Sequence, residues 1–245
     1  MVTLTEHTTV REVVVNHPQT RAVLEQRGVD YCCGGGQPLK EAAAEAGVAL
    51  DALLADLRQT IATPPPGAPA EPDWSQATVT ELVHHIEQRH HAFTKQQLPR
   101  LEGLLARVLK AHGARHGEAL AELQKVYRAL KADLDLHLLK EEQVLFPHLR
   151  ALDAPAEGPR PALACGSAAG PIRQMRLEHE EAGAALAALR DLTSGYALPP
   201  DACQSFRALY DGLRALEADL HEHIHLENNI LFPRALEHEP IPSLP

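Results

Sequence analysis

The chain has 245 residues, a formal net charge of −10 with histidine neutral, and only 4% aromatic residues. This length allows a full hydrophobic core and more than one domain, whereas the acidic balance argues against a nucleic-acid partner, which would need a basic face. No apolar stretch is long enough to span a bilayer, and the start MVTLTEHTTVREVVV lacks the basic-then-apolar order of a secretion signal. We therefore expect a cytoplasmic protein with no membrane-embedded part.

Residues 1–62 are expected to form a small helical domain. Thr9 and Glu12 make a capping-box pattern before VVVNHPQTRAVLEQRG, and Gly28 favours the end of that helix. Two further short helical patterns follow. A domain of this size is too small to be very stable alone, so we expect it to pack on the rest of the chain or on a second chain, and we favour a homodimer.

A proline-rich segment over 63–73, TPPPGAPAEPD, is typical of a semi-rigid linker. The unit that follows, over 74–245, contains four long segments with helical periodicity, interrupted by a long loop at 153–171. These segments run over 79–112, 115–152, 171–192 and 201–235. The pattern predicts an all-α protein, built as an up-down four-helix bundle behind a small helical domain.

The four cysteines are too few for a disulfide scaffold, and a cytosolic chain would keep them reduced. Cys165 and Cys203 are isolated, whereas Cys32 and Cys33 are adjacent and precede three glycines. Adjacent residues form a disulfide only with strain. Free, partly exposed thiols there could be redox-active or bind a metal in transit; the alternative is a buried structural pair at a helix end.

The bundle region contains an internal repeat. HLLKEEQVLFP, starting at His137, aligns without a gap on HIHLENNILFP, starting at His223, with His, Glu, Leu, Phe and Pro at identical offsets. Each string follows a helix that carries a further histidine: His91 lies 46 residues before His137, and His179 lies 44 residues before His223. The bundle is therefore interpreted as two copies of one helical hairpin.

The spacing within each copy predicts a metal site. His137 with Glu141, and His223 with Glu227, are four residues apart and share a helix face, within about 6 Å at Cβ. Two hairpins around a pseudo-twofold axis would bring four imidazoles and two carboxylates into the core, where the carboxylates can bridge two cations that offset their buried charge. This ligand set suits iron or manganese, and zinc or copper less specifically. A single His-Glu pair is usually a surface contact, but its repetition argues against that interpretation.

The ligand from the first helix of the bundle is less well defined. Four histidines lie on that helix, and the spacing does not choose between His90 and His91. Glu142 is expected to be a solvated acid, and His221 and His225 are expected to be exposed or to lie beside the site.

These motifs resemble the iron-sulfur cluster repair di-iron proteins, the repair of iron centres family, which join a short N-terminal domain to a hemerythrin-like domain. The resemblance covers essentially the whole chain. It rests on YCCGG from Tyr31, on LLKEEQVLFP and HIHLENNILFPRAL, on GPIRQMRLEHEEAG around His179, and on RHHAFTKQQLP, which matches best with His91 in the ligand place.

The resemblance implies two iron ions in an oxo- and carboxylate-bridged centre, with both glutamates bridging. It implies four histidine ligands in place of the five of oxygen-carrying hemerythrins, so each iron keeps an open or labile position for nitric oxide, a peroxide or an outgoing ligand. The implied ligands are His91, His137, Glu141, His179, His223 and Glu227.

The function implied by the resemblance is the repair of iron-sulfur clusters damaged by nitrosative or oxidative stress. Donation of iron to damaged iron-sulfur proteins would make the chain a repair protein, whereas removal of nitric oxide would make it a reductase-type enzyme. Cys32 and Cys33 would relay iron or electrons. The alternatives are a hemerythrin-like module that binds or senses oxygen or nitric oxide, and a purely structural bundle.

Overall fold

The computed structural model describes residues 4–63, 73–153 and 167–238. Most of the predicted proline-rich linker, most of the loop predicted over 153–171, and Cys165 lie outside these ranges. The described parts are helical and contain no strand, with one isolated bridge between Thr9 and Pro38. The predicted all-α class is confirmed.

The small N-terminal unit begins with the predicted capping box, in which Thr9 and Glu12 each bond the other's backbone N–H. The helix expected after it is interrupted at Pro18, because proline cannot donate the hydrogen bond that would continue the helix. Gly28 then adopts a φ of +69° and ends the second segment. The elements are α1 (Val10–Asn16), η1 (Pro18–Thr20), α2 (Arg21–Gln26), η2 (Gly34–Gly36), α3 (Leu39–Glu45) and α4 (Leu50–Ala62).

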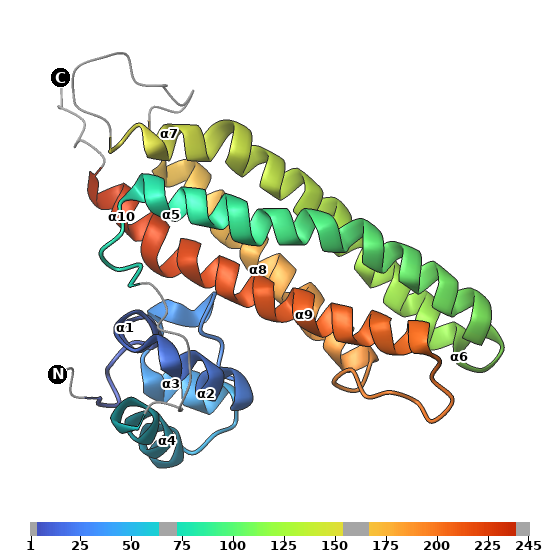
Figure 1. Ribbon diagram of the computed structural model, residues 1–245. Coiled ribbons are helices and arrows are strands. Elements are labelled where there is room, and N and C mark those ends of the chain that lie inside the picture. The colour runs from blue at the N-terminus through green and yellow to red at the C-terminus, as the bar shows by residue number, and fades with distance from the viewer. Residues whose placement is uncertain (1–3, 64–72, 154–166, 239–245) are drawn as a thin grey trace.

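The described part of the bundle has four antiparallel arms (Figure 1). The first two belong to one continuous run that folds back at His116, whose φ of −123° and ψ of 15° are not helical. Across this turn the Tyr127 hydroxyl donates to the Leu98 carbonyl at 2.7 Å. The run comprises α5 (Val79–His85), η3 (Ile86–His91), α6 (Ala92–Lys140), η4 (Glu141–Leu145) and α7 (Phe146–Arg150). The third arm is α8 (Ala169–Leu192), and the fourth comprises α9 (Gln204–Leu226), η5 (Glu227–Leu231) and α10 (Phe232–His238).

Two apolar clusters fill the bundle, one toward each end. One contains Leu134 and Leu220 and extends to the turn at His116, and the other contains Ile86 and Phe146 and extends to α10. Between them lies a layer of buried histidine and glutamate side chains. A dry polar layer between two apolar clusters is costly unless its charges are compensated.

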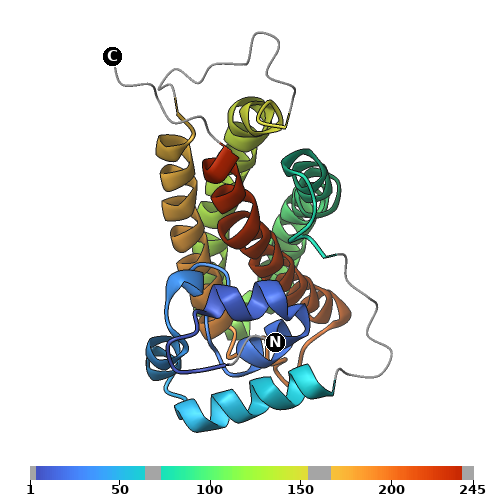
Figure 2. The same ribbon diagram turned by 90° about the vertical axis from the view of Figure 1, so that its left-hand side faces the viewer.

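The small unit has its own apolar core and lies against one side of the bundle (Figure 2). Several polar contacts tie it to the fourth arm, among them the pair of Arg21 with Glu222 at 3.3 Å and the bond from Asn229 Nδ2 to the Tyr31 carbonyl at 2.9 Å. The support that motivated the expected homodimer is thus supplied within one chain.

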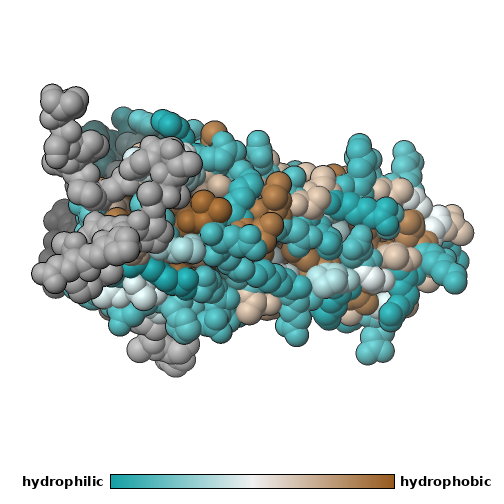
Figure 3. Space-filling view, turned by 90° about the horizontal axis from the view of Figure 1, so that it is seen from above, coloured by the Kyte–Doolittle hydropathy of each residue, from teal (hydrophilic) through white to brown (hydrophobic). Residues whose placement is uncertain are grey.

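The face of the bundle seen in Figure 3 is mostly hydrophilic, with hydrophobic side chains gathered in its middle part. Among the described residues, the most exposed large apolar side chains are Leu136 and Val144, each at 55%. No helix in the described ranges combines the length and apolar character needed to cross a bilayer.

Candidate metal centre

The buried polar layer is built where three of the four arms depart from regular α-helix. The π-helical turn η3 ends at His91, whereas η4 begins at Glu141 and η5 begins at Glu227. Single π-helical turns within α-helices recur at functional sites, because the extra residue in the turn changes the direction of the side chains. The two glutamates therefore occupy the same position in the two copies of the repeat.

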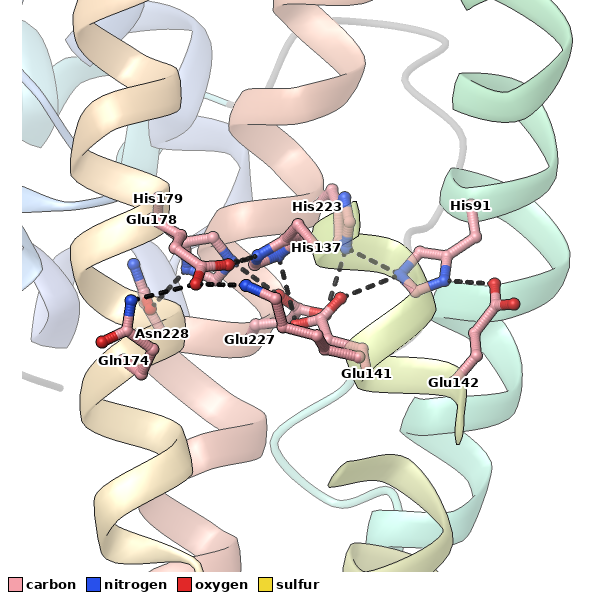
Figure 4. A network of polar contacts seen from close by, with 11 residues as sticks. His91, His137, Glu141, Glu142, Gln174, Glu178, His179, His223, Glu227 and Asn228 are labelled. Atoms are coloured by element: carbon pink, nitrogen blue, oxygen red, sulfur yellow. Dashed lines mark hydrogen bonds and ion pairs between the residues drawn. The ribbon is translucent and has the colours of Figure 1, made fainter. Parts of the chain in front are cut away.

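The structure brings together the six side chains singled out as ligands (Figure 4). They come from all four arms, and each is at most 4% exposed. They are His91, His137, Glu141, His179, His223 and Glu227.

Each glutamate faces two imidazoles. Glu141 Oε2 lies 3.4 Å from His91 Nε2, and its Oε1 lies 3.3 Å from His137 Nε2. Glu227 repeats this arrangement with the other two histidines, at 3.1 Å from one and 3.0 Å from the other. Both carboxylates thus offer one oxygen to each of two different points.

The imidazoles pair between the two copies of the hairpin. His91 Nε2 lies 3.1 Å from His223 Nε2, and His137 Nε2 lies 3.1 Å from His179 Nε2. The potential ligand atoms therefore form two groups of four among the described residues, each with two imidazole nitrogens and one oxygen from each glutamate. We call them the His91/His223 group and the His137/His179 group.

The six residues fit a pair of cations. Donor atoms bonded to one metal at about 2.0–2.1 Å lie roughly 3 Å from one another, which is the spacing within each group. Neither carboxylate oxygen of Glu141 makes a hydrogen bond within the described residues, although both are buried. Lone-pair donors converging in a dry interior need a cation or a proton between them.

In the metal-free protein, protons supply part of this compensation. Burial lowers the pKa of His137, but the facing Glu141 carboxylate outweighs it and raises the pKa to about 9. Burial raises the pKa of Glu227, yet the imidazoles of His223 and His179 bring it well below its ordinary value. For the fully buried His223, desolvation prevails and its pKa is lowered. The pKa of His91 is raised as well, chiefly by Glu141 against the effect of burial, so the metal-free site sets protonated imidazoles against charged carboxylates.

Comparison with known proteins matches the part of the chain that contains the six site residues to a cation-binding family. Residues 82–235, more than half of the chain, match the family model described as the hemerythrin HHE cation binding domain. The chain belongs to this hemerythrin family. A second model, ScdA_N, described as a domain of unknown function, matches residues 6–60.

Full-length relatives combine both regions. The chain is 36% identical over 228 residues to the iron-sulfur cluster repair protein YtfE of Salmonella schwarzengrund (strain CVM19633), which covers 93% of this chain and 96% of the relative. It is 37% identical over 229 residues to the protein of the same name from Escherichia coli O81 (strain ED1a), with the same coverage. The family resemblance inferred from the motifs is confirmed.

Three of the four imidazoles in this hemerythrin-type site are held from behind by neighbouring side chains. His91 Nδ1 lies 2.8 Å from Glu142 Oε1, and His137 Nδ1 lies 2.9 Å from Glu178 Oε2. Glu142 also binds Lys95, so the interpretation of Glu142 as a merely solvated acid is wrong. Such outer contacts fix the tautomer and orientation of metal-binding imidazoles.

The third contact differs because it uses an amide. His179 Nδ1 lies 3.0 Å from Asn228 Oδ1, and Asn228 follows Glu227 just as Glu142 follows Glu141. The repeat could have identified both positions, because a polar residue directly follows the site glutamate in each copy. Glu178 carries no such signal, because it directly precedes His179 and does not follow a site glutamate.

The remaining buried histidines near the site are turned to other partners. His90, which spacing alone could not separate from His91, lies with Nδ1 3.2 Å from Asp219 and outside both groups. His225 is buried and faces Asn229 at 2.9 Å, and burial lowers its pKa to about 3. His221 contacts Glu25 of the small unit at 3.4 Å. The hemerythrin-type layer therefore contains four converging imidazoles within the described residues.

A cavity of about 150 Å³ reaches the site between α6, α8 and α9. It touches His137, His179 and His223, and its other charged lining residues are Asp133, Glu178, Glu181 and Lys140, whose ammonium pairs with Glu178. A cleft with this acidic lining favours cations over anions.

Cys32 and Cys33 do not line that cavity. Their sulfur atoms are 3.8 Å apart without a disulfide, and they line a separate cavity of about 310 Å³ between the small unit and α8 and α9. The hydrogen bond to Cys33, together with burial and the nearby Asp30 carboxylate, raises the pKa of Cys32 well above its ordinary value. In this arrangement the Cys32 thiol keeps its proton and is a weak nucleophile.

A further cluster lies at the opposite end of the bundle. His112, His116 and Asp201 converge there, but all three are partly exposed. Asp201 already accepts from Arg115 and lies 3.0 Å from His116 Nε2. This cluster is accounted for as an ion-paired contact that fastens the turn at His116 to the loop before α9.

Proposed function

We propose that this chain is a di-iron protein that repairs iron-sulfur clusters damaged by nitrosative or oxidative stress. The observation that supports this most strongly is the arrangement of Glu141 and Glu227, each of which offers one oxygen to each of two imidazole pairs. The relatives that share both regions of the chain carry the name iron-sulfur cluster repair protein. We expect a protein with this function in the cytoplasm, where free cysteines stay reduced.

In this proposal the six converging residues hold two irons, and both glutamates bridge them. Each group supplies two nitrogen and two oxygen donors, so a six-coordinate iron would keep about two positions for other ligands. Bound iron would supply Lewis acidity and one-electron redox chemistry at those positions. The protein itself would supply orientation through Glu142, Glu178 and Asn228, and a dry layer between two apolar clusters.

Iron donation is favoured over reduction of nitric oxide by the lining of the cavity that reaches the site. Asp133 and Glu181 provide carboxylates along it, in addition to Glu178 with its Lys140 partner, and a departing cation is stabilised by this net negative lining. Nitric oxide is uncharged and gains nothing from an acidic wall. We propose that damaged iron-sulfur proteins receive the iron, with nitric oxide or a peroxide as an additional ligand of the site.

The cysteine pair is proposed to relay iron or electrons in a different arrangement of the small unit. In the described arrangement Cys32 is 6% exposed and keeps its proton because Cys33, burial and Asp30 raise its pKa. Cys33 is already partly exposed, so a relay role requires Cys32 to become accessible, which separation of the small unit from the bundle would provide.

The experiment is anaerobic transfer of iron from the loaded full-length protein to an apo-cluster protein. The Glu141→Leu, Glu227→Leu double variant should lose the transfer, because both metal positions lose their carboxylate ligands. A matched control, Glu102→Leu with Glu122→Leu, removes two glutamates of α6 outside the site, which pair with Arg128 and Lys125 respectively. This control should transfer iron as the wild type does.

Unchanged transfer by the site double variant contradicts the proposal. Stable, reversible oxygen binding by the reduced wild type without loss of iron would favour the oxygen-binding alternative. Metal analysis of protein purified without oxygen addresses the purely structural alternative, since a structural bundle would contain no iron.

A further inference from the structure

Asn228 joins the small unit to the metal site. It lies in η5 directly after Glu227, and it is 9% exposed. Its Nδ2 donates to the backbone carbonyl of Cys32 at 3.1 Å, and its Oδ1 accepts from His179 Nδ1 at 3.0 Å (Figure 4). One amide thus connects the cysteine segment with a histidine of the site.

The chemistry of these groups fixes the direction of both bonds. A backbone carbonyl can only accept, so the Cys32 carbonyl holds the NH₂ end of the Asn228 amide. The amide oxygen then faces His179 and requires the proton of that imidazole to be on Nδ1. Nε2 keeps its lone pair and faces Glu227 Oε2 at 3.1 Å, as a metal ligand must.

Without the Cys32 carbonyl, this orientation loses its support. An amide rotated by half a turn would present its NH₂ end to His179 Nδ1 and favour the tautomer with the proton on Nε2. That tautomer cannot bind a metal through Nε2. Docking of the small unit therefore selects the metal-binding form of His179.

The other three imidazoles do not depend on the small unit in this way. His91 and His137 are held by the carboxylates of Glu142 and Glu178, which lie on the bundle and accept through either oxygen. His223 Nδ1 has no hydrogen-bond partner within the described residues. Of the four imidazoles, His179 is the one whose described outer contact, through Asn228, connects to the small unit.

We propose that Asn228 is a positioning residue that couples docking of the small unit to retention of the metal in the His137/His179 group. While the small unit is docked, His179 is held in its ligand tautomer. When the small unit separates, which also exposes the cysteine pair, this metal is released before the one in the His91/His223 group. The inference rests on the proposed function, in that it assumes a metal in each group.

Gly35 offers a way to weaken docking of the small unit by a substitution within that unit. A Cβ atom at Gly35 would lie 2.1 Å from Asn229 Oδ1 and 2.9 Å from its Cγ, so Gly35→Ala displaces the buried Asn229 amide that bonds the Tyr31 carbonyl and thereby weakens docking. Asn229→Asp undocks by a second route, because it replaces the donor to the Tyr31 carbonyl with a carboxylate that repels it. Hydrogen exchange of the amides of residues 31–36 verifies undocking in either variant.

The matched variant for decoupling is Asn228→Asp. A carboxylate keeps an acceptor for His179 Nδ1 whichever way it rotates, so Asn228→Asp holds His179 in its ligand tautomer even though, like Asn229→Asp, it repels a backbone carbonyl of the small unit and undocks it. The experiment compares the wild type, Gly35→Ala, Asn228→Asp and the double variant. It measures the rate at which iron passes from the anaerobically loaded full-length protein to a ferrous chelator.

Gly35→Ala should accelerate loss of one of the two irons about tenfold, since outer contacts of metal ligands are typically worth 10–100-fold in affinity. In the Asn228→Asp background, Gly35→Ala should cause no acceleration. A second readout uses the zinc-loaded, diamagnetic protein, in which long-range ¹H–¹⁵N NMR observes Nδ1–H of His179. Its signal should shift in Gly35→Ala and stay unchanged when Gly35→Ala is added to Asn228→Asp.

Equal acceleration by Gly35→Ala in both backgrounds overturns the inference. So does an unchanged rate in a variant, Gly35→Ala or Asn229→Asp, whose hydrogen exchange reports an undocked small unit. Failure of the proposed function can be distinguished from failure of this inference, because it would appear as a wild-type protein that binds no iron. The His179 signal of the zinc-loaded protein would then still test the coupling.

Discussion

The two copies of the hairpin present the same ligands but hold them differently. Glu142 follows Glu141 in the first copy, reaches His91 and pairs with Lys95 near the surface. Asn228 follows Glu227 in the second copy and is covered by the small unit. The repeat thus determines the six ligand side chains, whereas the side chains behind the imidazoles depend on what each copy packs against. The two metal positions are therefore not equivalent.

The largest effect is expected from removing a glutamate that both positions share. Because each carboxylate gives one oxygen to each group, Glu141→Leu and Glu227→Leu should each lower bound iron to well under half of the wild-type content. Iron analysis after anaerobic loading measures this. If either variant lost iron from one position only, the two carboxylates would not be shared as described.

Removing the phenylalanine that follows each motif should destabilise both copies about equally. Phe146 and Phe232 are fully buried and stack on His91 and His179, at 5.4 and 6.0 Å between ring centroids. Each Phe→Ala variant should lower the free energy of unfolding of the metal-free protein by about 3–5 kcal/mol. Urea unfolding measures the loss, and a large difference between the two variants would contradict the equivalence of the inner layers.

The outer contacts should separate the two positions. Glu142→Gln should weaken metal binding in the His91/His223 group, and Glu178→Gln in the His137/His179 group, each by about 10–100-fold. Competition with chelators of graded affinity measures the two constants. Weakening of the same position by both variants would contradict the assignment of each carboxylate to its own imidazole.

The smallest effect concerns pH. Because the pKa of His137 in the metal-free protein is about 9, this imidazole is protonated at pH 7 and must lose a proton when a metal binds. Metal affinity should therefore rise with pH up to about 9. Calorimetry in buffers of different ionisation enthalpy measures the released proton, and binding without proton release would contradict the raised pKa.

The stability of the metal-free protein should follow the opposite trend. Protonated His137 facing Glu141 stabilises the folded state fully below the unfolded pKa of about 6.5. That contribution is lost as the pH rises through about 9. Thermal unfolding of the metal-free protein between these two pH values measures the loss.

The fold and the ligand layer follow largely from local spacing. Residues four apart on a helix must share a face, so His137 with Glu141 and His223 with Glu227 point to common sites whatever the rest of the chain does. The duplicated string identifies the hairpins, because a chance surface pair would not recur with the same Leu-Phe-Pro ending. The arms of the bundle follow from helical periodicity in the same way.

Other features depend on tertiary packing, which spacing does not report. The pairing of His91 with His223 joins residues of different copies and emerges only when the two hairpins are packed together. The π-helical turns at Glu141 and Glu227 could not be predicted, because nothing in the segments EEQVL and ENNIL distinguishes a π-helical turn from an α-helical one. The position of Glu142 next to the inward-facing Glu141 predicts a solvated side chain, but in η4 Glu142 reaches His91.

The most direct test of the account is Mössbauer spectroscopy, with iron analysis, of the anaerobically loaded full-length protein. The account predicts about two irons per chain, magnetically coupled through the shared glutamates and in two distinguishable environments, because Asn228 backs one group and Glu142 the other. A single isolated iron per chain, or no iron at all, would contradict it.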